Sequence, residues 1–355
     1  MEGGGVHMSI PGAIRWDAWY GKSGIAGDSE SWVPAAVEST LGPKRFQFRM
    51  PWFGVPSSQY AVSINGGTQA IMDAEITYAA AAGVKYWAYC WYEPSNSSLM
   101  KAWALHQSST IKNNVNWCMM LQESRANTSA YWTAHIPTWV SYFQQSNYQT
   151  VLSGRPVFYL FCDTVPFSGC AASVTALRAA TIAAGLKTPY IVVLYGNPPT
   201  SASIMSTIGA DAISDYQPKA GQSTTASNTD WPTAEAGMEA YWDAMRAAAP
   251  TGVVPICQTG WDTRPRHFLG TKLTNGRAHV GEAVYVTMPT QTQLTAHFQA
   301  AATYVNTTYP TACPSGLILI YSWDECDEGG NALIPSYSAG GPVTTALNAF
   351  SAVTW

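Results

Sequence analysis

Residues 317–328 read LILIYSWDECDE, an apolar run followed by a serine, a tryptophan and a group of four carboxylates. The apolar part is continuous rather than alternating, which is typical of a strand buried on both faces, as in a parallel sheet. The polar part follows directly, at the carboxyl end of the predicted strand. Active sites of parallel α/β proteins lie at this end of the sheet. The segment therefore predicts a parallel α/β protein with its chemistry at the strand ends.

Seven other apolar runs share this pattern, and alanine-rich segments with helical spacing separate them. Several of these segments stop at Gly or Pro, which are common helix terminators. The predicted strands are 13–20, 86–92, 115–121, 156–162, 190–195, 211–215, 253–258 and 317–322. The predicted helices are 68–82, 99–108, 128–149, 172–184, 201–207, 233–249, 291–306 and 344–352.

Eight strands alternating with helices predict an α/β fold, a single (β/α)8 TIM barrel with long βα loops over residues 11–355. Residues 1–10, which include three consecutive glycines, read as a cloning remnant or a disordered tail. A doubly wound open sheet is the alternative fold. It normally carries a glycine fingerprint for phosphate, and Gly66-Gly67 before the first predicted helix lacks the third glycine.

The composition is poor in charge and rich in aromatic residues. Charged residues make up 11% of the chain, aromatic residues 12%, and the net charge is −4, whereas about 25% charged residues is typical. Because there is no basic excess, a nucleic-acid partner is not expected. No apolar run reaches the roughly 18 residues of a membrane span.

Aromatic rings, where exposed, suit a neutral ligand rich in hydroxyl groups, so we expect an oligosaccharide or polysaccharide as the partner. The N-terminus shows no secretion signal of its own. A partner of this kind nevertheless leads us to expect an extracellular, periplasmic or virion-associated protein.

The predicted strands end in an unusually polar and aromatic set of residues. The chain has only 22 acidic residues, and a solvated surface would spread them over the helices. We interpret Asp163 and Asp211 as helix caps, a common role of aspartate. The candidates for substrate binding are Asp17, Trp19, Tyr20, Trp91, Tyr92, Glu93, Glu123, Tyr195, Asp215, Tyr216, Gln258, Trp261, Asp262, Arg264, Trp323 and Asp324.

The sharpest feature is the group of Asp324, Glu325, Asp327 and Glu328. Crowded carboxylates raise one another's pKa, as a general acid needs, and glycoside hydrolysis uses two carboxyl groups. Calcium binding is the competing explanation, although the spacing does not match an EF-hand loop. Scattered histidines without HExxH, and the absence of GxSxG, argue against a zinc protease or a serine hydrolase. We therefore expect neither a metal nor a cofactor.

Four segments, in chain order, resemble motifs of the WbsX-like and glycoside hydrolase family 99-like proteins. Residues 323–329, WDECDEG, resemble the eighth-strand motif W-N-E-W-x-E-G, and residues 260–266, GWDTRPR, resemble the seventh-strand motif G-W-D-N-T-P-R. Residues 117–123 and 154–159 resemble third-strand and fourth-strand segments of the family. The resemblance implies a (β/α)8 barrel that acts on a polysaccharide or glycan.

The resemblance also implies a mechanism, net retention through a 1,2-anhydro sugar. Glu325 corresponds to the base that deprotonates the sugar 2-hydroxyl, and Glu328 to the acid that protonates the leaving oxygen. Trp261, Asp262 and Arg264 correspond to sugar-binding residues. Asp324 stands where the family has Asn, and Cys326 where it has an aromatic residue, so the substrate and the linkage stay open.

Other interpretations of the same residues stay open. A conventional retaining pair, such as Glu123 with Glu325, is an alternative mechanism. The low charge also suits a non-catalytic glycan-binding barrel on a virion or cell surface. A glycosyltransferase is the third alternative, but it needs a basic diphosphate site, and Arg264 and Arg266 are the only close basic pair near the predicted site. We therefore predict a glycoside hydrolase.

Overall fold

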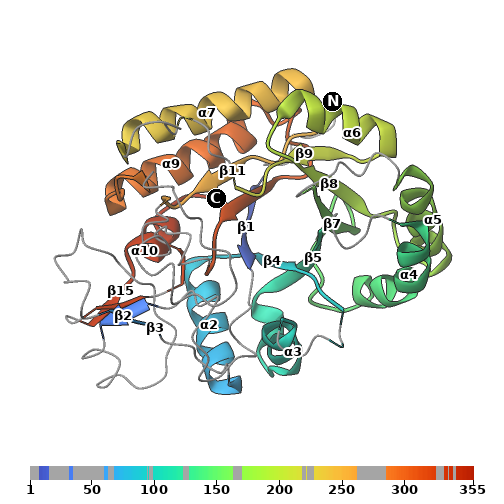
Figure 1. Ribbon diagram of the computed structural model, residues 1–355, viewed down its shortest axis with the longest axis horizontal. Helices are drawn as coiled ribbons and strands as arrows, with labels where there is room; N and C mark the ends of the chain where they lie inside the picture. The colour runs from blue at the N-terminus through green and yellow to red at the C-terminus, as the bar shows by residue number, and fades with distance from the viewer. Residues whose placement is uncertain are drawn as a thin grey trace.

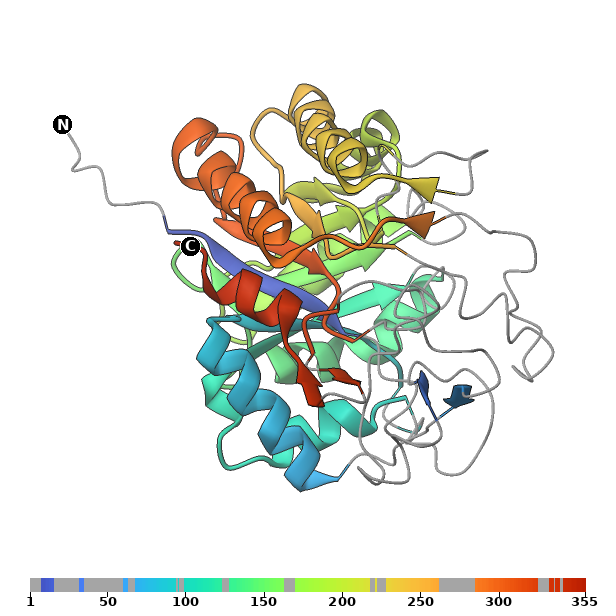
Figure 2. The same cartoon turned by 90° about the vertical axis from the view of Figure 1, so that its left-hand side faces the viewer.

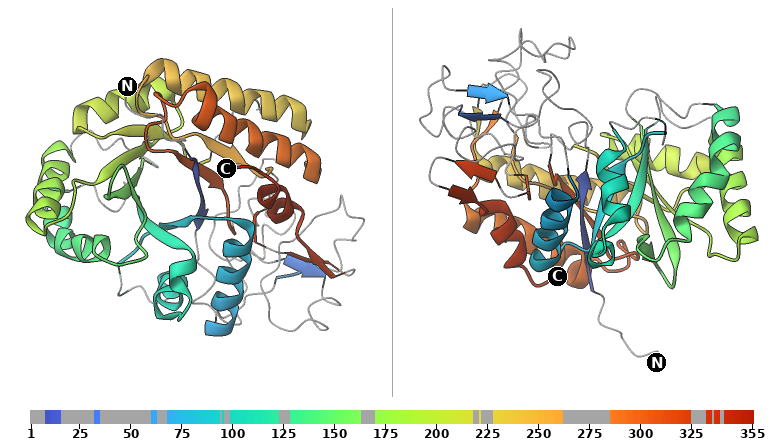
Figure 3. Two further views of the ribbon diagram at one scale, coloured as in Figure 1. Left: turned by 180° about the vertical axis from the view of Figure 1, so that it is seen from behind. Right: turned by 90° about the horizontal axis from the view of Figure 1, so that it is seen from below.

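The computed structural model describes residues 8–15, 32–34, 60–62, 68–93, 95, 99–122, 128–162, 170–217, 221, 228–261, 285–324, 332–334, 336–338 and 341–355. All eight predicted strands are confirmed within these residues, and they run parallel in the spatial order β11-β13-β1-β4-β5-β7-β8-β9. Figure 1 looks into the resulting barrel, and Figure 3 shows it from behind and from below. The strands are β1 Ile10–Arg15, β4 Tyr86–Cys90, β5 Asn116–Gln122, β7 Arg155–Phe161, β8 Tyr190–Leu194, β9 Ala212–Ser214, β11 Ile256–Gln258 and β13 Leu317–Tyr321.

The ring closes between β9 and β11 through a short contact, which we call the seam. The amide of Ile213 donates to the carbonyl of Gly252 at 2.8 Å, and the amide of Val254 donates to the carbonyl of Ile213 at 3.0 Å. A single parallel bridge joins Ile213 to Val253. With the seam included, the eight strands form the closed barrel that the sequence predicts.

Helices surround the strands (Figure 1), and within the described residues there are eight α-helices, each of which matches a predicted one. Side-chain caps explain where several of them begin, because a side-chain oxygen accepts an otherwise unpaired amide of the first turn. These caps are Thr68, Thr128, Asn197, Asp230 and Thr290. The helices are α2 Gln69–Ala82, α3 Lys101–Ser108, α4 Ser129–Phe143, α5 Ala171–Ala183, α6 Pro198–Ile208, α7 Trp231–Ala248, α9 Gln291–Thr303 and α10 Thr345–Ser351.

Several boundaries differ from the prediction, among them those of β1 and α4. Strand β1 begins at Ile10, three residues before the predicted start, and residues 16–20 lie outside the described residues. Helix α4 ends at Phe143 rather than at residue 149. The chain leaves the helix because Gln149 donates to the carbonyl of Trp117 at 2.7 Å and β6 (Thr150–Val151) pairs with β7.

Large side chains fill the barrel, so its interior is a packed core. The hydroxyl groups of Tyr86 on β4 and Tyr159 on β7 form a 2.7 Å hydrogen bond across it. The ring of Tyr86 occupies the space that a Cβ atom on Gly12 of β1 would need. A glycine is therefore required at this position of β1, for close approach rather than for an unusual backbone angle.

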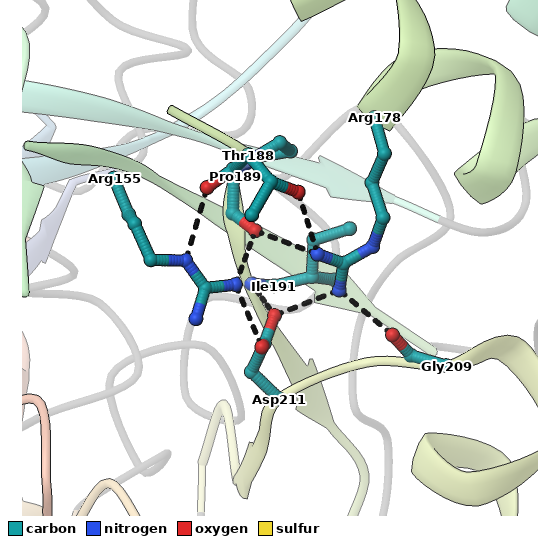
Figure 4. Close-up of polar contacts among 7 residues, drawn as sticks. All are labelled: Arg155, Arg178, Thr188, Pro189, Ile191, Gly209 and Asp211. Atoms are coloured by element: carbon teal, nitrogen blue, oxygen red, sulfur yellow. Dashed lines mark hydrogen bonds and ion pairs between the residues drawn. The ribbon is translucent and has the colours of Figure 1, made fainter. Parts of the chain in front are cut away.

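An ion-pair clasp joins β7, β8 and β9 at their amino ends (Figure 4). The carboxylate of Asp211 accepts from Arg155 at 2.7 Å, from Arg178 at 2.8 Å and from the amide of Ile191 at 3.0 Å. The interpretation of Asp211 as a helix cap is therefore wrong, because all three of its partners belong to the barrel wall or to α5. The other proposed cap, Asp163, lies outside the described residues.

The opposite end of the barrel, which holds the carboxyl ends of the strands, carries three short ribbons (Figure 2). These ribbons belong to βα connections, which meet at this end of the fold. They pair β2 (Trp32–Pro34) with β3 (Tyr60–Val62), β10 (Asn228–Thr229) with β12 (Tyr285–Val286), and β14 (Ser336–Ser338) with β15 (Gly341–Val343). Of the helices in the described part of the chain, none is both long and apolar enough to cross a membrane.

Candidate active site

The carboxyl ends of the strands hold the described candidate residues, but several candidates lie outside the described residues. Those outside are Asp17, Trp19, Tyr20, Glu123, Asp262, Arg264, Glu325 and Glu328. Their assigned roles stay predictions. Those described are Trp91, Tyr92, Glu93, Tyr195, Asp215, Tyr216, Gln258, Trp261, Trp323 and Asp324.

An aromatic group, which we call the mouth cluster, comes together at the ends of β7, β9, β11 and β13. The ring of Tyr216 stacks on that of Phe161, with centroids 4.3 Å apart and planes inclined by 16°. Tyr321 meets Tyr216 edge to face at 5.6 Å and lies 6.5 Å from Trp261. The amide group of Gln217 donates to the Tyr321 hydroxyl at 2.8 Å. Phe161, Tyr216 and Gln217 are half-buried, so this cluster offers aromatic surface and also a polar group at the barrel mouth.

Asp215 precedes the stacked Tyr216 in the chain, and its buried carboxylate fixes the backbone at this point. It accepts from the amide of Tyr216 at 2.7 Å and from the hydroxyl of Tyr241, on α7, at 3.0 Å. Burial raises the pKa of Asp215, while its hydrogen bonds act in the opposite direction. The hydroxyl of Tyr241 also lies 3.4 Å from the carbonyl of Tyr195. Asp215 thus fixes the backbone that carries Tyr216, and a direct sugar contact of Asp215 stays a prediction.

Two of the three candidates at the end of β4, Trp91 and Glu93, contact the surrounding helix α4. The indole of Trp91 is fully buried and packs edge to face on His135 and Trp139 of α4. Tyr92 is buried as well, and the carboxylate of Glu93 accepts from the hydroxyl of Tyr131 at 2.6 Å. Trp91 therefore belongs to the layer between the barrel and α4, and a role as an exposed sugar platform does not fit this position.

A buried ionic group, which we call the Arg15 cluster, lies between helix α2 and the carboxyl ends of β1 and β13. The side chain of Arg15 is completely buried, and its guanidinium lies 2.7 Å from the carboxylate of Glu75 on α2 and 3.7 Å from that of Asp324. It also stacks over the ring of Trp87 at 4.4 Å. The indole of Trp323 donates to Glu75 at 3.1 Å. Asp324 and Trp323 are thus fixed in the barrel wall, where both are fully buried.

The same part of the chain is held by backbone hydrogen bonds on both sides of the predicted catalytic segment. The amide of Trp323 donates to the carbonyl of Ile14 at 2.8 Å, and the amide of Ile334 donates to the carbonyl of Trp323 at 2.8 Å. The amide of Leu333 donates to the carbonyl of Ser322 at 2.9 Å. The residues before and after 325–331 are therefore anchored together at the carboxyl end of β13.

A neutral histidine borders the Arg15 cluster. The Nε2 atom of His106, on α3, lies 3.1 Å from the carbonyl of Val115, and Nδ1 lies 3.3 Å from the hydroxyl of Tyr89. The ring therefore carries its proton on Nε2 and accepts the tyrosine hydroxyl at Nδ1. Burial, reinforced by the charge of Arg15, lowers the pKa of His106 to about 3.

This histidine is expected to make the fold sensitive to mild acid. Its pKa is about 3 in the folded chain and about 6.5 in an unfolded one. The unfolded chain therefore binds more protons between these values, and stability falls as the pH drops below about 6.5, by up to about 1.4 kcal/mol per pH unit. His106→Gln removes this contribution. Urea unfolding should show the stability gap between wild type and variant narrowing by about 2 kcal/mol from pH 7 to pH 5. A gap that stays constant over this range would show that His106 is not the group responsible.

The described residues at the strand ends combine ring faces, amides and carboxylates. Gln258 lies at the end of β11 and is buried, three residues before Trp261 in the chain and opposite Tyr321 in the sheet. Among the described strand-end residues, no three His, Cys, Asp or Glu side chains lie close enough to share a metal ion. Such a site can bind a planar or ring-shaped polar ligand through stacking and hydrogen bonds.

Sequence reasoning missed three members of the mouth cluster, namely Phe161, Gln217 and Tyr321. Phe161 and Tyr321 are the last residues of β7 and β13, and they read as ordinary members of the apolar runs. No signal in the sequence shows that they face the mouth, because both faces of these strands are apolar. Arg15 and Glu75 were also missed, although a charge at the end of an apolar strand and one within an alanine-rich helix are both unusual.

The comparisons with known proteins concern the fold. Neither a protein-family profile nor a curated protein sequence matches this chain. Two solved structures of a GH99 endo-alpha-mannosidase from Bacteroides thetaiotaomicron are similar, one of them in complex with Bis-Tris-propane. The complex is 13% identical, with a TM-score of 0.53 over 96% of this chain and 95% of its own. The other is 12% identical, with a TM-score of 0.53 over 96% of this chain and 94% of its own. At this identity the likeness shows the (β/α)8 fold.

Proposed function

We propose that the protein is a glycoside hydrolase that cleaves a mannose-containing polysaccharide or glycan outside the cytoplasm. Glu325 and Glu328 are the proposed base and acid. The single observation that carries the proposal is the position of β13, whose carboxyl end leads through the anchored Asp324 directly into Glu325. In a (β/α)8 barrel this is the end at which catalytic residues lie.

The fold likeness supports the same class of reaction. The similar solved structures are endo-alpha-mannosidases, and the likeness extends over almost the whole of both chains. A fold of this kind hosts many chemistries. The spacing of Glu325 and Glu328, together with the aromatic mouth cluster, is what directs the proposal to sugars.

The proposed reaction proceeds in two steps. The carboxylate of Glu325 takes the proton of the sugar 2-hydroxyl while the oxygen of that hydroxyl attacks the anomeric carbon. In the same step Glu328 gives a proton to the departing glycosidic oxygen. Water then opens the 1,2-anhydro sugar, with the two glutamates in reversed roles, so the anomeric configuration is retained. The stacked rings of Phe161 and Tyr216 support the sugar, and Gln217 supplies a hydrogen bond.

A conventional retaining pair is the second mechanism, with Glu123 and Glu325 as the carboxyl groups. In that case the two would lie about 5–5.5 Å apart, whereas an inverting pair would lie about 6.5–9.5 Å apart. Glu123 comes directly after β5 in the sequence, which supports a role for it at the same end of the barrel as the proposed site.

A panel of defined oligosaccharides tests the function. We expect cleavage of α-mannosides, detected by mass spectrometry, with products that carry the substrate's anomeric configuration when proton NMR is recorded before mutarotation. β-Mannan and α-glucan of similar length serve as matched controls for the sugar and the linkage. If the protein binds α-linked substrates but cleaves none of them, the hydrolase proposal is wrong and the protein is a non-catalytic glycan-binding barrel. Inverted products would exclude both retaining mechanisms.

A further inference from the structure

Helices α7 and α9 run side by side on the outside of the barrel (Figure 1), and three potential metal ligands meet between them. Glu235 and Glu239 lie on α7, and His297 lies on α9. One ligand atom from each of these side chains lies within 4.8 Å of the other two. This group belongs to the helical layer and contains no residue of the mouth cluster.

The histidine of this group has buried nitrogens that need a partner. His297 is completely buried, and within the part of the chain that the structure describes neither Nδ1 nor Nε2 has a hydrogen-bond partner. Its ring stacks on Trp242 at 5.4 Å and meets Trp231 edge to face at 5.7 Å, so the packing fixes its orientation. A buried polar group without a partner costs about 1–3 kcal/mol. A coordinated ion is one of the few arrangements that would satisfy such a nitrogen.

The two glutamates are held close together without a compensating cation. They stand four residues apart on one helix, so their carboxylates share a face, and like charges in this arrangement repel. Among the residues that the structure describes, neither forms an ion pair. Burial raises the pKa of both carboxyl groups; the charge of Glu239 adds to this at Glu235, and that of Asp243 at Glu239.

We propose that Glu235, Glu239 and His297 bind a divalent transition-metal ion, with Zn²⁺ as the best fit. Zinc binds imidazole nitrogens and carboxylate oxygens, and three protein ligands leave a fourth position for water. Zinc–ligand bonds of about 2.0–2.2 Å in a tetrahedron separate the ligand atoms by about 3.4 Å. Rotation of the two glutamate side chains would bring the observed spacing to this value.

The metal would join two helices that the chain places on either side of β11. Helix α7 precedes β11 and α9 follows it, and Trp231 and Trp242 of α7 already pack against His297. The ion replaces repulsion between the carboxylates by a shared ligand and satisfies a buried nitrogen. We assign it a stabilising role, which is independent of the proposed hydrolase.

Metal-dependent thermal stability tests the site. The protein is stripped with a chelator, dialysed and titrated with Zn²⁺, with Mn²⁺ and Mg²⁺ in parallel. One equivalent of zinc is expected by elemental analysis, and saturation is expected to raise Tm by about 3–6 °C. Mg²⁺ should have little effect, because it prefers an all-oxygen octahedral site.

Two variants separate the site from adventitious binding. His297→Phe keeps an aromatic ring in the stack, so the stripped protein should fold with a Tm near that of wild type, while zinc affinity falls at least about tenfold. Asp243→Asn removes the next carboxylate along α7 and should leave zinc binding unchanged. The proposal is overturned if wild type binds no zinc, if zinc does not change Tm, or if His297→Phe binds zinc as tightly as wild type.

Discussion

Glu328→Gln is expected to lower kcat on unactivated glycans by about 10²–10⁴-fold, because general acid catalysis contributes about this much. The amide keeps the size and hydrogen-bonding ability of the carboxyl group but cannot give up a proton to the leaving oxygen. KM should change little, since binding rests on other groups. An aryl glycoside with an acidic phenol as leaving group needs no proton, so it should retain most of its rate.

Glu325→Gln is expected to give a loss of the same size on both kinds of substrate. The reason is that Glu325 activates the 2-hydroxyl, whatever the leaving group. A substrate lacking the 2-hydroxyl should resist wild type for the same reason. The contrast between the two variants on the aryl glycoside thus assigns the acid and the base separately.

Two other carboxylates provide controls for these losses. Asp327→Asn lies between the two glutamates in the chain and has no proposed chemical role, so it should keep kcat within a few-fold of wild type. Glu123→Gln should do the same under the 1,2-anhydro mechanism. A large loss in Glu123→Gln, with cleavage of the 2-deoxy substrate intact, would instead favour Glu123 with Glu325 as a conventional retaining pair.

Arg15→Met is expected to destabilise the fold by about 3–5 kcal/mol, the usual effect of removing one partner from a buried ionic group. The guanidinium is completely buried and faces Glu75 at 2.7 Å and Asp324 at 3.7 Å. Methionine fills much of the volume, but it leaves two buried carboxylates without their cation. Chemical denaturation with two independent probes measures the change.

A combined variant tests the cause of this loss. Adding Glu75→Gln and Asp324→Asn to Arg15→Met removes both charges and should recover much of the lost stability, because neutral amides cost less to bury than charges. Arg246→Met is the matched control, since Arg246 pairs with Asp243 on the surface at 3.2 Å, where such pairs contribute about 0–1 kcal/mol. If the triple variant is as unstable as Arg15→Met alone, lost packing rather than charge is the cause.

The barrel was predictable from the sequence because its strands are buried on both faces. Runs such as 190–195 are continuously apolar, and the strand there, Tyr190–Leu194, differs from the prediction by a single residue. The extent of α4 was not predictable in the same way. The residues after Phe143 have helical character, but pairing with β5 and β7 overrides this local preference.

Burial on both faces makes the strands predictable, but it also hides the direction of the side chains at their ends. In a strand buried on both faces, the inward and outward residues are equally apolar. The sequence therefore does not show which residues point into the barrel and which point toward the helices. Along β4, Tyr86 bonds to Tyr159 across the barrel, whereas Trp87 contacts His106 of α3. Trp91 continues the outward series, which is why a residue predicted to bind sugar packs against α4 instead.

Pairings between distant residues were out of reach for a different reason. The sequence shows no zinc motif because Glu239 and His297 lie on different helices, before and after β11 in the chain. Arg15 and Asp324 likewise come from the two ends of the chain. Spacing rules describe ligands within one local element, and these groups depend on the closed barrel.

The position of β1 between β13 and β4 bears on how the protein is made. During synthesis β4 is available to β1 early, but the other neighbour, Leu317–Tyr321, leaves the ribosome only when most of the chain has been translated. Until then the far edge of β1 presents unpaired backbone groups, and Arg15 lacks one of its carboxylates. For most of translation the nascent chain therefore has an unpaired, aggregation-prone strand edge. Chaperones commonly protect growing proteins in such a state.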